Sequence, residues 1–469
     1  MAAIKTDLLV IGAGSGGLSV AAGAVQMGAD VTLLEKGKMG GDCLNYGCVP
    51  SKALLASAKQ AHGQTTGEIF GVTAQEPTVD YAAAKAHVAD VIAGIAPHDS
   101  QERFEGLGVR VIRAHGRFTG PQTVVAGDDE ITARRIVIAT GSTPFVPPIP
   151  GLDEVDYHTN ETIFDLVERP EHLLIIGGGP IGLEMAQAHV RLGSRVTVLE
   201  GAKALGRDDP ELAAVVLDRL RTEGVEIVET AKVTSVSATS TGVAVETEGG
   251  PHEGTHLLVA VGRKATTSDL DLKKAGVAVT SRGVKVDARL RTTNPKIFAI
   301  GDAAGGLQFT HVAGYHAGIV IRQSLFGLPT KAATHHLPWV TFTDPEMAQV
   351  GLTEAEARAT HGTKLEVLRF PYAENDRARA DRATEGLVKV MVVGGRPVGA
   401  SIVGRQAGEL INLWALVLAN RLKISAVANM VAPYPTLGEL NKRAAGQYYV
   451  PRLFQSDTVK RFVRFVQRF

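Results

Sequence analysis

The chain has 469 residues and 45% hydrophobic content, enough for three or four domains of ordinary size, each with its own core. Lys plus Arg and Asp plus Glu both total 49, and this zero net charge removes the electrostatic basis for a general nucleic-acid binder. No apolar stretch approaches the roughly 18 residues of a membrane span, and the N-terminal segment enters a strand pattern too early for a signal peptide, so we expect a cytoplasmic protein.

The first pattern runs from Asp7 to Glu35: an apolar strand, a glycine turn, an Ala-rich helix and a second apolar strand that ends in an acid. This succession predicts a βαβ unit. Gly12, Gly14 and Gly17 are spaced for a tight turn, a close approach of the backbone to a pyrophosphate and close packing of helix on strand. The carboxylate of Glu35 can accept hydrogen bonds from a ribose hydroxyl pair, so the unit predicts a dinucleotide site.

Both cysteines of the chain lie in the next segment, GGDCLNYGCVPSKALL. Cys43 and Cys48 are five positions apart, about 7.5 Å of rise in a regular helix, whereas a disulfide needs its Cα atoms within about 6.8 Å. The segment must therefore bend if the pair is bonded, and Asn45 and Gly47 permit a bend. Pro50 suits the first turn of a helix, which places Cys48 near a helix N-terminus, where a thiolate is stabilised.

This cysteine pair has three interpretations: a redox-active pair, a structural staple or a metal site. Closing so short a loop stabilises a fold by only about 2 kcal/mol. A structural zinc needs four ligands, and no histidines stand at a zinc-motif spacing from the pair. The redox-active pair is therefore favoured, and no metal site is predicted.

The glycine pattern returns in HLLIIGGGPIGLEMAQAHVRLGSRVTVLE, which predicts a second dinucleotide site. Gly177, Gly179, Gly182 and Glu200 each lie 165 positions after their counterparts in the first unit. Two sites suggest that one cofactor stays bound while the other comes and goes. The carboxylate of Glu200 would repel the 2′-phosphate of NADP and favours NADH, with NADPH as an alternative because two basic residues lie just downstream.

Turn and composition signals divide the chain. RIVIATGSTPFVPPIPG is a strand, a glycine turn and a proline-rich connector that ends the first domain. KIFAIGDAAGG places Gly301 and Asp302 at the carboxyl end of a buried strand, where ligands collect in α/β sheets. We predict a first dinucleotide-binding domain at 1–151, a second at 152–266, a return to the first at 267–336 and a separate C-terminal domain at 337–469.

The cysteine segment resembles the active-site segment of the class I pyridine nucleotide-disulfide oxidoreductases, which include mercuric reductase, dihydrolipoamide dehydrogenase and glutathione reductase. The likeness covers essentially the whole chain, with two βαβ fingerprints, ATG at 139–141 and GDAA at 301–304. It implies an α/β fold of two Rossmann-like domains and a C-terminal α+β dimerisation domain, a homodimer, FAD in the first site and a nicotinamide nucleotide in the second. Thr140, Gly141, Gly301 and Asp302 would join the FAD site.

The resemblance also implies roles for individual side chains. Hydride would pass from nicotinamide to flavin, and electrons from flavin to the disulfide. Cys48 would be the flavin-proximal thiol that forms a charge-transfer pair with FAD, and Cys43 the interchange thiol that attacks the acceptor. Lys52 would lie near the flavin N5 and pair with Glu184, while Asp302 would bond the ribityl chain of FAD.

The stretch VAPYPTLGELNKRAA departs from part of the family. The lipoamide and glutathione enzymes have a histidine before Pro-Thr as acid/base, paired with a glutamate five positions on. Glu439 is in place here, but Tyr434 occupies the histidine position, and a phenol with a pKa near 10 is a poor base at neutral pH. Mercuric reductase has a tyrosine there, which can donate a hydrogen bond or orient a metal ion; packing at a dimer interface is the alternative for Tyr434.

The chain ends in DTVKRFVRFVQRF, a basic amphipathic helix by its spacing. Packing on the partner subunit is the expected role of residues 457–469, and a weak membrane-surface contact is the alternative.

Together these features predict an FAD-dependent NAD(P)H:disulfide oxidoreductase of mercuric reductase type. It would pass electrons from NADH through FAD to Cys43 and Cys48, and on to a small-molecule disulfide or a metal ion, with no nucleic-acid partner. The alternatives are a dihydrolipoamide dehydrogenase, a reductase that delivers electrons from flavin directly to metals or quinones, and a redox-sensing, membrane-docking flavoprotein.

Overall fold

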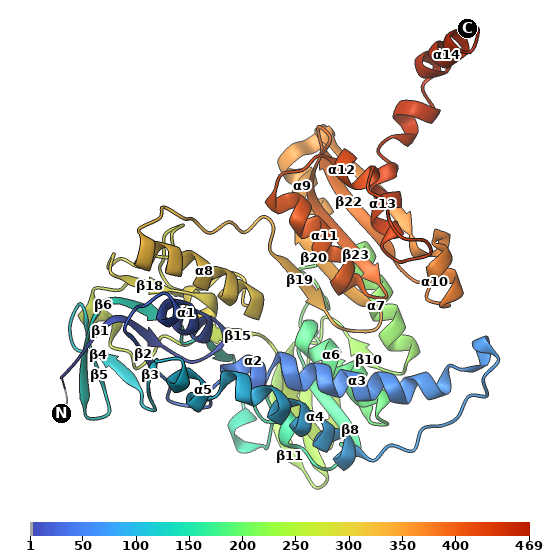
Figure 1. Cartoon of the computed structure of the whole chain (residues 1–469). Coiled ribbons are helices and arrows are strands. Elements are labelled where there is room, and N and C mark those ends of the chain that lie inside the picture. Colours follow the sequence, from blue (N-terminus) through green and yellow to red (C-terminus); the bar gives the residue numbers. More distant parts are fainter. Residues whose placement is uncertain (1–2) are drawn as a thin grey trace.

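The structure is a computed structural model that describes residues 3–469, and it confirms the predicted α/β fold class (Figure 1). The chain first builds a mixed sheet with helices, then a second α/β unit, returns to the first sheet, and ends in an antiparallel sheet covered by helices.

The first domain is built on a seven-stranded sheet. Its strands lie in the order β3 (Arg110–Ile112), β2 (Val31–Leu34), β1 (Ala3–Ile11), β6 (Asp129–Ile138), β5 (Thr123–Ala126) and β4 (Gly116–Phe118), with β18 (Ile297–Ala299) also paired to β6. The apolar run of β1 is buried and pairs in parallel with β2 and β6, so that Val10 lies opposite Leu33 and Val137. Helices α1 (Ser15–Gln26) and α8 (Thr310–Phe326) pack against each other beside this sheet.

The second domain repeats the arrangement on a smaller scale. Its parallel sheet has the order β10 (Glu226–Val228), β9 (Arg195–Leu199), β8 (His172–Ile176) and β14 (His256–Val259). Helix α6 (Pro180–Arg191) follows the glycine turn, α7 (Pro210–Thr222) follows β9, and a meander of β11 (Val233–Thr239), β12 (Gly242–Thr247) and β13 (Gly250–Gly254) precedes β14.

The C-terminal domain is an antiparallel sheet with helices packed on it. The strand order is β19 (Pro338–Thr341), β20 (Glu346–Gly351), β23 (Arg396–Gly404), β22 (Leu387–Val393) and β21 (Leu365–Pro371). Its helices are α9 (Glu354–His361), α10 (Asp376–Ala380), α11 (Ala407–Ala419), α12 (Ile424–Ala428) and α13 (Glu439–Gly446). Trp414 of α11 is fully buried and donates its indole N–H to Asn441 of α13 at 2.8 Å, which ties the two helices together.

A buried lysine joins the second and C-terminal domains. The ammonium of Lys389 in β22 lies 2.8 Å from both carboxylate oxygens of Asp209, which caps the N-terminus of α7. It also lies 2.6 Å from Glu211 and 3.1 Å from Glu354. Since only 2% of the lysine side chain is exposed, its charge is matched by these carboxylates rather than by water.

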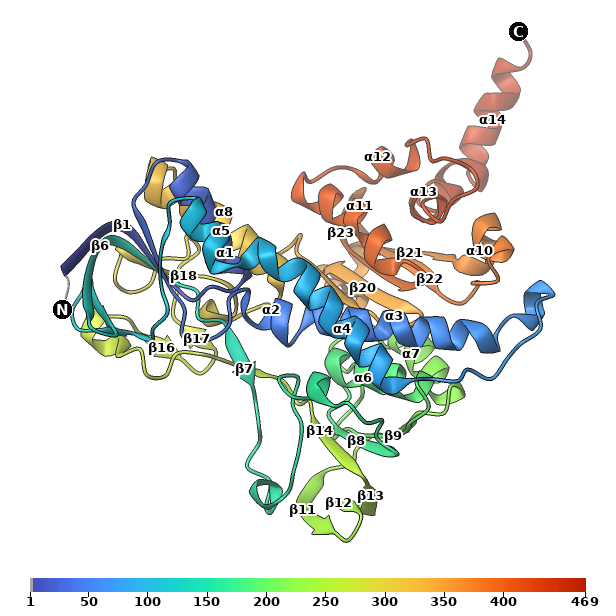
Figure 2. The ribbon, with the colours of Figure 1, turned by 60° about the horizontal axis from the view of Figure 1, so that its bottom comes forward.

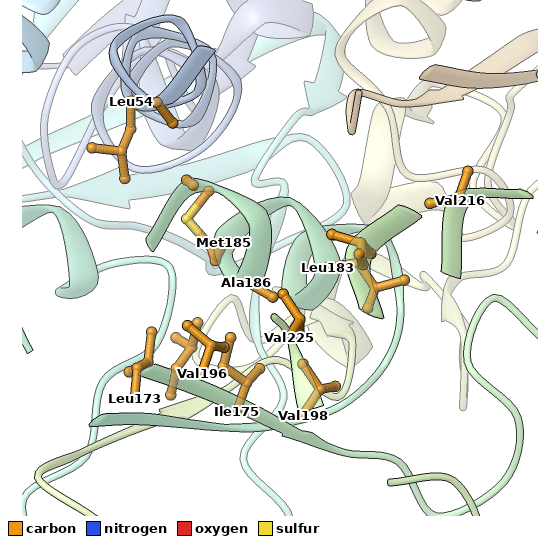
Figure 3. Close-up of a cluster of buried hydrophobic side chains, with 14 of the residues drawn as sticks. Leu54, Leu173, Ile175, Leu183, Met185, Ala186, Val196, Val198, Val216 and Val225 are labelled. Carbon is orange, nitrogen blue, oxygen red and sulfur yellow. The ribbon is translucent and has the colours of Figure 1, made fainter. Parts of the chain in front are cut away.

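Helix α3 (Cys48–Thr65) carries the cysteine pair's second member and packs along α6 of the second domain. Leu54 of α3 is fully buried in the same cluster as Leu183 and Met185 of α6 and Leu173 of β8. Figure 3 shows Leu54 on one side of α6 and the strand residues on the other. The start of α3 and the residues of α6 are therefore held in register by one packed core.

Helix α14 (Asp457–Val466) follows a π-helical segment, Val450–Phe454, and projects from the C-terminal domain in both views (Figures 1 and 2). Residues 460–469 are all exposed. Among residues 3–469, no helix combines the length and apolarity needed to cross a membrane.

Candidate active site

The first glycine loop connects β1 to α1. Gly12 has φ +107°, where a side chain is strained, and a Cβ on Gly17 would collide with the carbonyl oxygen of Gly12. Gly14 differs, since its nearest neighbour would be the Cα of Gly41 at 4.0 Å. The helix N-terminus and the open side of Gly14 together fit the approach of a pyrophosphate.

The second loop, between β8 and α6, has the same construction. Gly177 has φ +114°, and a Cβ on Gly182 would collide with the carbonyl oxygen of Gly177. A Cβ on Gly179 would meet nothing within 4 Å. The residues present therefore fit two dinucleotides, one per domain.

The two acids that follow the second strand of each βαβ unit also accept hydrogen bonds from the glycine loops. Glu35 accepts hydrogen bonds from the backbone N–H of Ala13 in the glycine loop (2.7 Å) and of Gly37 (2.6 Å). Glu200 repeats this arrangement with two bonds of 2.7 and 2.8 Å. Each carboxylate thus also fixes the loop that is shaped for the pyrophosphate.

Thr140 and Gly141 follow β6, and the hydroxyl of Thr140 donates to the carbonyl of Thr266 at 2.6 Å. A cavity opens at the carboxyl ends of the strands of the first sheet. It is lined by Ile11, Gly12, Leu34, Lys36, Ala114, His115, Gly116, Thr140, Thr266, Ser268 and Leu270. Its position and its mixture of apolar, hydroxyl and basic side chains suit the nucleoside end of a dinucleotide.

Gly301 and Asp302 lie directly after β18. The backbone N–H of Gly301 donates to Nδ1 of His316 at 3.2 Å. Asp302 accepts a 2.5 Å hydrogen bond from the hydroxyl of Ser142, which in turn accepts one from Arg263 at 2.7 Å. Burial raises the pKa of the Asp302 carboxyl, while the bond from Ser142 and the charge of Arg263 oppose that rise.

The cysteines lie on either side of the predicted bend. Cys43 is in the short helix α2 (Gly41–Asn45), and Cys48 is the first residue of α3. The amide of Asn45 holds the bend by donating to the carbonyls of Met39 (3.0 Å) and Gly41 (2.8 Å). Both cysteines are free thiols, Cys43 half-buried and Cys48 exposed.

The two thiols differ in electrostatics. A hydrogen bond from the Cys43 thiol lowers the pKa of Cys48 to about 6, with help from the Thr310 hydroxyl and the charge of Lys52. Partial desolvation by the protein atoms around the sulfur opposes this shift, although the residue reaches solvent. The sulfur of Cys48 lies 3.6 Å from the Thr310 hydroxyl. The same bond to Cys48, followed by burial, raises the pKa of Cys43. In this reduced, dithiol state, these shifts favour the thiolate on Cys48 and the proton on Cys43.

Lys52 and Glu184 form the ion pair that the resemblance implies, with 2.7 Å between Nζ and Oε2. The other oxygen of Glu184 accepts the backbone N–H of Phe342 at 2.9 Å. The Lys52 ammonium lies 4.4 Å from the centroid of the Phe342 ring. The lysine is thus held one turn after Cys48 by contacts from the second and the C-terminal domains.

Tyr434 and Glu439 lie in the C-terminal domain. Tyr434 is 71% exposed, and its hydroxyl donates to Asp376 at 3.2 Å, a bond that raises the pKa of the phenol. Within residues 3–469, no hydrogen bond or ion pair joins either residue to the cysteine pair, and no cluster of three or more His, Cys, Asp and Glu could hold a metal ion.

Several residues that contact the site were not predicted from the sequence. Thr310 contacts Cys48 from 262 positions away, and Arg263 reaches Ser142 across 121. Arg263 also pairs with Asp42 beside Cys43 at 3.0 Å. No local motif marks these residues, because each acts through a contact that only the fold creates.

Comparison with known proteins identifies the family. Residues 6–317 match the pyridine nucleotide-disulphide oxidoreductase family, and residues 337–445 match its dimerisation domain. The chain belongs to this family. A mercuric reductase from Streptomyces lividans is 36% identical over 97% of both chains. A dihydrolipoyl dehydrogenase from Geobacillus stearothermophilus is 35% identical over 94% of this chain and 96% of its own.

A solved structure of a flavoprotein disulfide reductase supports the same family assignment. The Cu(II) complex of the HOCl-induced flavoprotein disulfide reductase RclA from Escherichia coli superposes with a TM-score of 0.84 at 31% identity, covering 93% of this chain and 99% of that one. The protein is accordingly a flavin-dependent pyridine nucleotide-disulfide oxidoreductase that uses FAD and NAD(P)H, which confirms the family, activity class and cofactors expected from the sequence.

Proposed function

We propose that this oxidoreductase uses NADH to reduce a thiophilic metal ion through Cys43 and Cys48, in the cytoplasm and as a homodimer. The single observation that carries the proposal is the placement of two free thiols, Cys43 in α2 and Cys48 at the start of α3, in a chain that has Tyr434 at the position of the expected histidine base. The lowered pKa of Cys48 supports it. When bound, FAD supplies the two-electron link between nicotinamide and the cysteine pair.

The proposed roles follow from the contacts. Cys48 is the sulfur that receives the electron pair when the disulfide opens, and in the reduced pair Cys43, Thr310 and Lys52 keep it as a thiolate. Cys43 meets the acceptor. Lys52, held by Glu184, places a fixed positive charge next to the thiolate. Gly12, Gly14, Gly17, Glu35, Thr140, Gly141, Gly301 and Asp302 bind FAD, and Gly177, Gly179, Gly182 and Glu200 bind NADH.

A metal-ion acceptor suits a site without a base. The Cys43 proton must leave before its sulfur can react, and the pKa of this thiol is raised. A coordinated metal ion displaces a thiol proton directly, so no histidine is needed. Two thiolates also form the soft ligand set that such ions prefer. Relatives named for mercury, and one solved with Cu(II), support this acceptor class.

A disulfide acceptor is the second candidate, and the presence of Glu439 and the dihydrolipoyl dehydrogenase relative favour it. The Cys43 thiolate would attack one external sulfur and release the other half as a thiolate. Cys48 would then attack Cys43, release the second half and close the Cys43–Cys48 disulfide. Two electrons from NADH restore the dithiol.

The test compares turnover of NADH and NADPH with Hg(II), Cu(II), lipoamide and oxidised glutathione. We expect NADH turnover with a metal ion and weak lipoamide reduction. Tyr434→His should raise lipoamide turnover, because an imidazole with a pKa near 6.5 takes the thiol proton; Tyr434→Phe is the matched control. Metal-ion turnover that survives Cys43→Ser would refute the thiol route and favour direct reduction by the flavin. Lipoamide as the best acceptor of the wild type would favour the second candidate.

The dimer is proposed because the chain carries the family's dimerisation domain. In the dimer, Tyr434 of the partner subunit would face the cysteine pair, with Glu439 of the partner subunit behind it. A mixture of inactive Cys43→Ser chains and Tyr434→Phe chains should then show a different activity from the average of the two homodimers.

A further inference from the structure

Helix α14 presents two opposed faces to solvent. At about 100° per residue, Val459, Phe462, Val463, Phe465 and Val466 fall on one side. Lys460, Arg461, Arg464 and Arg468 fall on the other, and Asp457 is the only acid of the segment. Phe462 is 65% exposed and Phe465 57%, so the apolar side is not covered by the body of the chain.

The apolar side continues at both ends of the helix. Phe469 is 98% exposed, and its ring packs edge-on against Phe465 with 5.5 Å between centroids. Before the helix, Leu453 and Phe454 in the π-helical segment are also exposed. Such an array of large apolar side chains beside concentrated positive charge is unusual on a free surface.

The helix stands outside the dimerisation domain. The match to that domain ends at residue 445, before α14 begins at Asp457. Within residues 3–469, the last polar side-chain ties to the body are those of Arg452, which pairs with Glu366 at 2.8 Å and stacks 3.6 Å from the centroid of the Tyr448 ring. Figures 1 and 2 show α14 held clear of the domains beyond this point.

We propose that α14 is a membrane-surface anchor that binds anionic bilayers. Charge complementarity selects this occupant: a bilayer offers an apolar layer for the phenylalanines and, a few ångströms above it, anionic headgroups for the four basic side chains. Ser456 prepares the helix by accepting the N–H of Val459 at 3.4 Å, and the bilayer stabilises a helix too short to persist alone.

The experiment is co-sedimentation of the FAD-loaded, full-length protein with vesicles of phosphatidylcholine, with and without phosphatidylglycerol. We expect binding only to the anionic vesicles, weakened as salt rises. Lys460→Ala with Arg464→Ala should weaken binding about thirty-fold, at roughly five-fold per charge. Phe462→Ser with Phe465→Ser should weaken it about a hundred-fold. Lys273→Ala with Lys364→Ala, which removes two exposed charges from the body, is the matched control and should leave binding unchanged.

Deletion of residues 457–469 should abolish vesicle binding and leave the oligomeric state and NADH turnover in solution unchanged. The proposal would be overturned by equal binding to neutral and anionic vesicles or by absence of binding. It would also be overturned if the deletion dissociated the dimer, a result that would favour packing on the partner subunit. The inference does not rest on the proposed acceptor, because vesicle binding is measured without turnover.

Discussion

Replacing Cys43 by alanine leaves Cys48 as the only cysteine of the chain and removes the hydrogen bond that contributes most to its low pKa. Cys43→Ser is the matched variant, because serine keeps an O–H donor at the same position while removing the second thiol. Comparing the two single-cysteine proteins therefore isolates the effect of this hydrogen bond on the pKa of Cys48.

The expected size of the effect follows from the strength of a hydrogen bond to a charged group, roughly 1.5 to 3 kcal/mol, where one pKa unit is about 1.4 kcal/mol. Because Cys48 is exposed in the chain, solvent weakens the bond and the lower end applies. We expect the pKa of Cys48 to stay near 6 in Cys43→Ser and to rise by about one unit in Cys43→Ala. The thiolate should therefore form as pH increases through about 6 in the first protein and about 7 in the second.

The assay is the rate of alkylation of the FAD-loaded variants by iodoacetamide across pH 4 to 10, followed by intact mass. Each protein takes up one label, so the rate profile belongs to Cys48 alone. The same midpoint in both variants, or a midpoint near the ordinary thiol value of 9.0, would refute the assignment of Cys43 as the donor that stabilises the thiolate.

Three further perturbations test the frame around this pair. Gly14→Ala should fold normally, because its Cβ meets no close protein atom, but it should lose FAD on dialysis, because that Cβ fills the space left for the pyrophosphate. Gly17→Ala should lower the free energy of unfolding in urea by about 2 kcal/mol, because its Cβ collides with Gly12. Equal effects of the two variants would contradict this division. Lys52→Met should lower the free energy of unfolding in urea by about 2 kcal/mol, and Lys52→Arg should restore most of that loss. The loss is smaller than the roughly 3 to 5 kcal/mol of a fully buried ion pair, because 37% of the lysine side chain is exposed. Glu200→Gln should raise kcat/KM for NADPH relative to NADH about five-fold by removing one charge near the 2′-phosphate; an unchanged ratio would remove Glu200 from cofactor choice.

The parts of the site that lie in one stretch of sequence were predictable. The glycine loops, the strand-end acids and the bend between Cys43 and Cys48 depend on spacing along the chain, and the structure forms them where the residues indicate. The resemblance to the family also pointed to Lys52 and Glu184, although nothing in their local sequence distinguishes either from a surface charge. The structure pairs the two residues.

The remaining parts depend on contacts between distant segments. Thr310 approaches Cys48 only because β18 returns to β6 and delivers the start of α8 to the cysteine loop. The loop-fixing bonds of Glu35 could not be separated from its ribose role, since both need a carboxylate at the same strand end. For α14, the sequence predicted the amphipathic helix but not that the helix stands clear of its own chain.

The central claim is that NADH reduces a disulfide between Cys43 and Cys48. The most direct test is to alkylate the denatured holoenzyme before and after anaerobic addition of NADH and to count the added groups by intact mass. With only two cysteines in the chain, we predict no label before NADH and two labels after it. The same number of labels with and without NADH would contradict the account.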